Sequence, residues 1–96
     1  MLTIEQLQAR RHELIELARM HKAENIRVFG SVARGEANEN SDVDLLVHFH
    51  PDASLFDLMD LQEASANLLN TKVDVISDRG LSPLIAPQIL NEAKAL

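Results

Sequence analysis

The sequence contains no cysteine, which excludes disulfide frameworks, thiol nucleophiles and cysteine-ligated zinc, and which predicts a reducing, cytoplasmic setting. Tryptophan and tyrosine are also absent, and three phenylalanines are too few to form an aromatic platform on which nucleic-acid bases stack. Positive charge is scarce, because 9 Lys and Arg stand against 15 Asp and Glu and give a formal charge of -6. We therefore expect no direct nucleic-acid binding that depends on neutralising phosphates.

Long apolar segments are missing as well. No apolar run approaches the roughly 20 residues of a membrane-spanning helix, and charged residues stand where a signal peptide has its apolar centre. We expect a soluble protein with no membrane contact. The 96 residues suffice for one domain, and a hydrophobic content of 46% with 25% charged residues predicts a packed core. The sequence thus predicts a single domain over residues 1–96.

Helical and strand patterns alternate along the chain. Thr3 and Gln6 form a capping pattern, and the apolar residues after them recur at helical spacing, which predicts a helix over residues 3–21. The order of elements predicts an α/β (α+β) domain, in which helices pack on a small mixed sheet of three strands. The other predicted elements are strands over 26–29, 42–49 and 72–77, a short helix ended by Gly35, a helix from Ser54 to Leu69, and a last helix over 87–95.

Two acidic residues lie at the start of the second predicted strand. Asp42 and Asp44 are two residues apart, so their side chains leave the same face of the strand with Cα atoms roughly 6.5 Å apart. Val43 and Leu45 point to the opposite face and fix that register. Two carboxylates at this spacing repel each other unless a cation lies between them. Because no other ligand type is near in sequence, the oxygen donors favour Mg²⁺, with Mn²⁺ as the alternative, over zinc.

A third carboxylate, Asp74, lies between Val73 and Val75 in the next predicted strand. An unpaired charge in such an apolar segment is costly, so we expect Asp74 to lie beside the first pair. Three carboxylates on neighbouring strands can bind two metal ions roughly 3.5 to 4 Å apart, the arrangement that serves phosphoryl or nucleotidyl transfer. Asp74 can also accept the proton of an attacking hydroxyl group.

A candidate phosphate-binding turn precedes the acidic pair by ten residues. Gly30 and Ser31 follow the first predicted strand, where glycine allows close approach of the backbone and where free N–H groups and the serine hydroxyl can bind an anion. Arg34, one turn later, adds a positive charge. The segment GSVARGEA is neither a Walker A loop nor a GxGxxG dinucleotide turn. Pyrophosphate would be the leaving group.

The complete string FGSVARGEANENSDVDLLV resembles the signature of the minimal nucleotidyltransferase (MNT) branch of the DNA polymerase beta-like nucleotidyltransferase superfamily. The similarity is detailed over residues 29–47 and extends through SLFDLMDLQE and KVDVIS, so that it covers most of the chain. It implies the polymerase beta-like fold, contacts from Gly30 and Ser31 to nucleotide phosphates, and a metal-binding triad of Asp42, Asp44 and Asp74. No motif position departs from the family pattern, so the resemblance implies an active enzyme.

The resemblance also implies a partner. Small MNT proteins are antitoxins that neutralise a HEPN-domain RNase toxin by transferring AMP from ATP to a toxin tyrosine. Because this chain has no tyrosine, such a modification must occur on another protein. Two alternatives remain open: an antitoxin that acts by binding and occlusion without catalysis, and a nucleotidyltransferase for a small molecule.

Two further features have simpler explanations. His48 and His50 lie two residues apart and could form a metal pair, but the carboxylates already account for a metal, and the strand end near Pro51 is expected to be solvent-exposed. The leucines of residues 58–69 are expected to lie mainly in the core. Any surplus apolar face there, or on the last helix, is a candidate partner surface.

Overall fold

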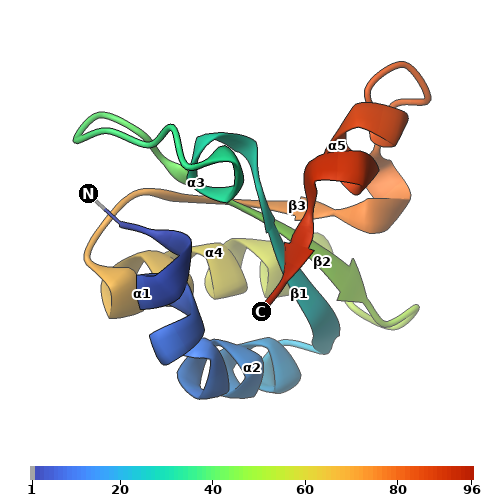
Figure 1. Cartoon of the computed structure of the whole chain (residues 1–96). Helices are drawn as coiled ribbons and strands as arrows, with labels where there is room; N and C mark the ends of the chain where they lie inside the picture. The colour runs from blue at the N-terminus through green and yellow to red at the C-terminus, as the bar shows by residue number, and fades with distance from the viewer. Residues whose placement is uncertain (1) are drawn as a thin grey trace.

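The computed structural model describes residues 2–96, which form a mixed sheet of four strands in the order β3-β2-β1-β4. The strands are β1 (Ala23–Phe29), β2 (Val43–Phe49), β3 (Val73–Ser77) and β4 (Lys94–Ala95). The helices are α1 (Ile4–Ala9), α2 (Arg11–Met20), α3 (Gly30–Arg34), α4 (Leu55–Leu69) and α5 (Ala86–Glu92), with a 3-10 turn η1 over Asp78–Gly80. In Figure 1, α1, α2 and α4 gather on one side of the sheet, and α5 lies on the other.

The fourth strand corrects the prediction of three strands, while the α/β class with a mixed sheet is confirmed. β2 pairs with β3 in parallel, whereas β1 pairs with β2 and β4 in antiparallel orientation. The last helix was predicted to continue to Ala95, but Ala93 adopts an extended conformation. The next two residues then pair with the free edge of β1, and the Leu96 N–H donates to the Ile26 carbonyl at 3.2 Å. A two-residue strand carries no periodic signal, so only the tertiary pairing reveals it.

The single helix predicted over residues 3–21 is also wrong, because it consists of α1 and α2 with a break at Arg10. The predicted capping box of Thr3 and Gln6 is present. Arg10 leaves the helical conformation (φ −105°, ψ 12°), and its side chain forms an ion pair with Glu13 at 2.8 Å. Leu7 and Leu14, one from each helix, are both fully buried.

The other elements follow the predictions closely. Gly35 ends α3 and Asn70 ends α4, both in the left-handed conformation. The Ser54 N–H at the start of α4 donates to the Asp57 carboxylate at 2.8 Å. β1 begins at Ala23 rather than residue 26, because the chain continues through an irregularity at Asn25, whose φ is +56°. Such a bulge places a poor strand former inside a strand, which the residue preferences alone do not indicate.

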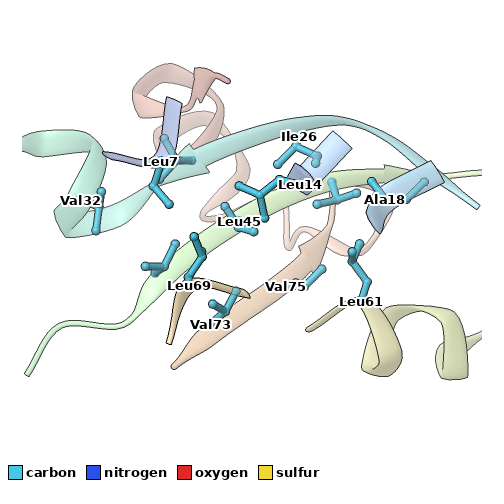
Figure 2. Packing of buried hydrophobic residues seen from close by; sticks show 14 of the residues in the cluster. Leu7, Leu14, Ala18, Ile26, Val32, Leu45, Leu61, Leu69, Val73 and Val75 are labelled. Carbon is cyan, nitrogen blue, oxygen red and sulfur yellow. The ribbon is translucent and has the colours of Figure 1, made fainter. Parts of the chain in front are cut away.

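The main core lies between one face of the sheet and helices α1, α2 and α4. Strand residues such as Ile26, Leu45 and Val75 pack against helix residues that include Leu14 and Leu61 (Figure 2). At the outer edge of β3, the Val75 N–H donates to the Gln62 side chain of α4 at 2.9 Å, which covers part of that edge. Among residues 2–96, no helix is both long and apolar enough to cross a membrane.

The opposite face of the sheet is only partly covered. Its apolar part is a small cluster in which Ile89 of α5 packs on Phe29 and Leu46. Because side chains alternate along a strand, this face also receives Asp44 and His48 of β2 and Asp74 of β3. The charged residues of β2 and β3 therefore gather on the face that the main core does not use.

Candidate active site

Asp44 and Asp74 are brought together by the parallel pairing of β2 and β3. They are direct register partners, so their side chains leave the same face of two strands that lie roughly 4.8 Å apart. Asp42 precedes β2 by one residue and acts electrostatically on Asp44, as does Asp74. The structure therefore places the three predicted carboxylates in one region of the sheet, at the end of β2 that lies nearest to α3.

The surroundings of Asp44 disfavour its ionised form. Partial burial raises the pKa of Asp44, and the negative charges of Asp74 and Asp42 raise it further. The positive charge of Arg34 acts in the opposite direction but does not cancel these effects. A nearby cation would favour the ionised form of this carboxylate.

The donor chemistry fits a hard divalent cation, since the three side chains offer only carboxylate oxygens. Within residues 2–96, however, no three acidic or histidine side chains stand close enough together to form a finished ligand set. Asp42 instead faces Lys72, whose Nζ lies 3.6 Å from Asp42 Oδ2 at an exposed position. The partly buried Asp44, with the negative charges of Asp74 and Asp42 close to it, is the observation that fits a metal here, and the assignment of ligands stays a prediction.

Gly30 lies directly against Asp44, because Phe29, the last residue of β1, is the register partner of Asp44. Gly30 has a φ of +74°, and a Cβ atom at this position would collide with Asp44 Oδ2. Both the backbone conformation and the close approach thus require glycine. Ser31 follows as the second residue of α3, so the predicted turn does lie beside the predicted acidic pair.

Arg34 also lies near this turn, where two carboxylates bind it. Its Nε donates to Glu36 at 3.1 Å, and its Nη1 donates to both carboxylate oxygens of Glu92 at 3.3 and 3.2 Å. These hydrogen bonds, first to Glu36 and then to Glu92, raise the pKa of Arg34. The positive charge of Arg34 therefore lies beside the turn and acts on Asp44, and its role in binding phosphates stays a prediction.

Glu92 is the site neighbour that the sequence analysis missed. Its Oε1 accepts a hydrogen bond from the Gly30 N–H at 2.9 Å, although 62 residues separate the two in the chain. No local motif marks Glu92, because its place depends on α5 crossing the sheet and on the pairing of β4 with β1. Pairing of the C-terminal segment with β1 is the feature from which the position of Glu92 could have been inferred.

The two histidines do not form a metal pair in the described chain. His48 Nδ1 lies 3.0 Å from Asp78 Oδ1, whereas His50 Nε2 lies 3.6 Å from Glu24 Oε1. Arg27 also donates to Asp78, at 2.9 Å. Burial alone would raise the pKa of Asp78, but the hydrogen bonds from His48 and Arg27 outweigh it and hold that pKa below its ordinary value. This cluster links β1, β2 and η1 at the end of the open face away from Asp44.

Comparison with known proteins shows what the chain is similar to. Residues 13–96 match the model of a family described as the nucleotidyltransferase domain. The protein adenylyltransferase MntA of Thermococcus cleftensis is 39% identical over 94 residues, which cover 96% of this chain and 94% of that protein.

Solved structures give the same result for the fold. A structure assigned to the minimal nucleotidyltransferases superposes with a TM-score of 0.87 at 47% identity and covers 99% of this chain and 97% of its own. A toxin-antitoxin crystal structure with AMP-PNP contains a chain that superposes with a TM-score of 0.75 at 27% identity, over 88% of this chain and 69% of that chain. The similarity therefore includes β4 and α5 as well as the motif-bearing segment.

Proposed function

We propose that this chain, which belongs to the minimal nucleotidyltransferase family, is an antitoxin that transfers AMP from ATP to a tyrosine hydroxyl of a HEPN-domain toxin. Its activity as a nucleotidyltransferase follows from the family. The proposal adds the donor ATP, the dependence on Mg²⁺, the site residues and the acceptor.

One observation carries the proposal: the register pair of Asp44 and Asp74 lies beside the turn at Gly30. Nucleotidyl transfer needs negatively charged groups that bind a metal and, next to them, backbone and cationic groups that bind phosphates. Two elements distant in sequence supply these two requirements on one face of the sheet. The relative from Thermococcus cleftensis is named a protein adenylyltransferase, which supports a protein acceptor.

The reaction assigns a distinct task to each group of residues. Gly30, Ser31 and Arg34 bind the triphosphate and direct its α-phosphorus toward the acidic face. The acceptor oxygen attacks that phosphorus, the bond to the bridging oxygen breaks, and pyrophosphate leaves. Asp74 accepts the proton of the acceptor hydroxyl, so that one AMP is added for each pyrophosphate released.

Asp42, Asp44 and Asp74 would hold magnesium in this scheme, with two ions expected. When bound, magnesium neutralises the charge that develops on the phosphate oxygens. Its presence would also counteract the partial burial and the negative charges that raise the pKa of Asp44.

Exposed apolar side chains offer a surface for the partner protein. On α4, Leu55, Phe56 and Met59 are 68%, 73% and 53% exposed. The relation to a toxin is supported by the toxin-antitoxin structure with AMP-PNP, whose chain shares the fold at 27% identity. We assign the HEPN class of toxin on the resemblance of the motif string.

The test is transfer of label from ATP. The full chain is incubated with ATP labelled at the α-phosphate, MgCl₂ and a HEPN-domain toxin, and the toxin is then examined for bound AMP and its modified residue. We expect label on a toxin tyrosine that depends on Mg²⁺ and is lost in Asp42→Asn and Asp44→Asn. Label that persists in both variants would contradict the assigned site.

Protection of cells distinguishes catalysis from occlusion. Asp44→Asn keeps the fold and the exposed face of α4, so a purely occluding antitoxin would still neutralise the toxin in this variant. We expect protection to be lost together with transfer. Transfer to a small hydroxyl compound without any partner would instead favour the small-molecule alternative.

A further inference from the structure

Glu92 connects the end of α5 with the turn that follows β1. The Gly30 N–H donates to its Oε1 at 2.9 Å, and its side chain is only 18% exposed. A hydrogen bond to an ionised acceptor that is largely shielded from water is stronger than an ordinary surface contact. The turn is therefore held by a residue outside the segment that contains it.

The same carboxylate holds Arg34. Both oxygens of Glu92 accept from Nη1 of Arg34, while Glu36 accepts from Nε. The Arg34 side chain is 43% exposed, so without these contacts its guanidinium would sample several rotamers. Contacts on two sides of the guanidinium fix its direction near the turn.

Packing on both sides fixes the place of Glu92 itself. Three residues earlier, Ile89 is buried against Phe29 and Leu46. Directly afterwards, β4 pairs with β1 through Lys94 and Ala95. Both anchors contact β1, the strand that leads into Gly30, so Glu92 and the turn share one rigid support.

We propose that Glu92 is a positioning residue, which orients the Gly30–Ser31 turn and Arg34 for the phosphates of the nucleotide without touching the nucleotide itself. This inference rests on the proposed function for the identity of the ligand. The Gly30 N–H and Arg34 Nη1 donate to Glu92, so the donors offered to the phosphates are the other N–H groups of the turn and of the guanidinium. Donors held in a fixed direction lose less freedom on binding, so the bound phosphates gain more from them. Because Glu92 is negatively charged and repels a triphosphate, its contribution has to come from geometry.

Three variants separate geometry from charge. Glu92→Ala removes the contacts to both Gly30 and Arg34. Glu92→Gln keeps an amide oxygen that can accept from the Gly30 N–H but loses the ion pair. Glu36→Ala is the matched control, because it removes an equal charge from the same guanidinium and leaves the Gly30 hydrogen bond in place.

Calorimetric titration of the full chain with AMP-PNP and MgCl₂ measures the effect without relying on transfer. We expect Glu92→Ala to weaken binding about tenfold, which is the loss expected for hydrogen bonds to a charged group. Glu36→Ala should weaken it less, and Glu92→Gln should recover part of the loss. In transfer assays, the KM for ATP should rise more than kcat falls. In the nucleotide-free protein, the Gly30 amide resonance should shift in Glu92→Ala but not in Glu36→Ala.

Two results would overturn the inference. Tighter binding of AMP-PNP by Glu92→Ala would mean that this carboxylate competes with the phosphates for the same donors. Unchanged binding with a lower melting temperature would mean that Glu92 only stabilises the fold. Failure of the proposed function would give a different result. The wild-type chain would bind AMP-PNP but leave the toxin unlabelled, while the variants would keep the expected order of AMP-PNP affinities.

Discussion

The two faces of β2 consist of alternating residues of one short strand, yet they serve opposite purposes. Val43, Leu45 and Val47 are buried in the main core under α1, α2 and α4. Asp44 and His48 leave the other face, where only Leu46 joins the small cluster under α5. One face is continuous and apolar, whereas the other is interrupted by charges that are costly to bury.

This difference shows how a small domain can tolerate a group of neighbouring negative charges. Partial burial and, after it, the neighbouring negative charges raise the pKa of Asp44, so its ionised form is less favourable in the folded state than in the unfolded chain and lowers stability at neutral pH. The opposite face offsets this cost through burial of apolar side chains. Substitutions on the core face should therefore change stability and leave the activity of the folded protein intact, whereas substitutions on the acidic face should change nucleotide binding or activity.

The largest effect is expected for Asp44→Asn, on activity. Removing this charge should lower the rate of nucleotidyl transfer by about 100 to 1,000-fold, because groups that stabilise the transition state electrostatically contribute on this scale. The rate is measured as label transferred at saturating ATP.

Stability is the control for this variant. Since the raised pKa of Asp44 marks an unfavourable charge, Asp44→Asn should keep or raise the denaturation midpoint. A clear fall in the midpoint would mean that the Asp44 carboxylate stabilises the fold, and this would contradict the assignment of the acidic face to activity.

Leu45→Ala should have the largest effect on stability. Leu45 is 1% exposed and points into the main core, so the cavity should cost about 3 kcal/mol of unfolding free energy. Denaturant unfolding measures the loss. Once the rate is corrected for the folded fraction, transfer should be close to that of the wild type.

Leu46→Ala is the matched variant on the other face. Leu46 is fully buried but packs with Ile89 of α5, whose last residue is Glu92. We expect a loss of stability of similar size together with a loss of nucleotide affinity. Equal nucleotide affinities in Leu45→Ala and Leu46→Ala would contradict the claim that the two faces of β2 have different roles.

Gly30→Ala should cost about 2 kcal/mol of stability, since the φ of +74° is strained for alanine and the new Cβ would collide with Asp44. Gly35→Ala separates the two causes, because Gly35 has a φ of +73° but open space where its Cβ would lie. Only Gly30→Ala should also weaken binding of AMP-PNP in calorimetry. The same affinity in both variants would contradict the close approach at Asp44.

The smallest effect is expected for Asp78→Asn, at about 1 to 2 kcal/mol, because Arg27 and His48 lose a partly buried hydrogen-bond acceptor. The folded-state pKa of Asp78 is lowered, so this stabilisation is complete above the ordinary carboxyl pKa and is lost as pH falls through the lowered pKa. Denaturation midpoints measured across acidic pH should therefore converge for the two proteins. Asp52→Asn, at an exposed ion pair with Lys22, should change little at any pH.

Much of this arrangement could be predicted from local sequence. Alternation in DVDLLV fixed which residues share a face of β2, and the endings of α3 and α4 were predicted at Gly35 and Asn70. β4 could not be predicted, because a pairing of two residues depends on a free strand edge brought near by the fold. Glu92 was missed for the same reason.

Parallel pairing placed Asp74 beside Asp44 as expected, but the finer geometry of the site is not a matter of spacing. Asp42 contacts Lys72, and two carboxylates form ion pairs with Arg34. These contacts depend on side-chain positions that only the folded structure defines. Periodicity indicates which face a residue occupies, and the tertiary structure decides which partner it finds there.

Nucleotide binding that depends on a divalent ion tests the acidic face most directly. The wild type, Asp44→Asn and Asp74→Asn are titrated with AMP-PNP in the presence and absence of MgCl₂, and heat uptake is measured by calorimetry. We expect the wild type to bind only with Mg²⁺ and both variants to lose that dependence along with most of the affinity. Equal binding by all three proteins, with or without Mg²⁺, would contradict the assignment of this face as the active site.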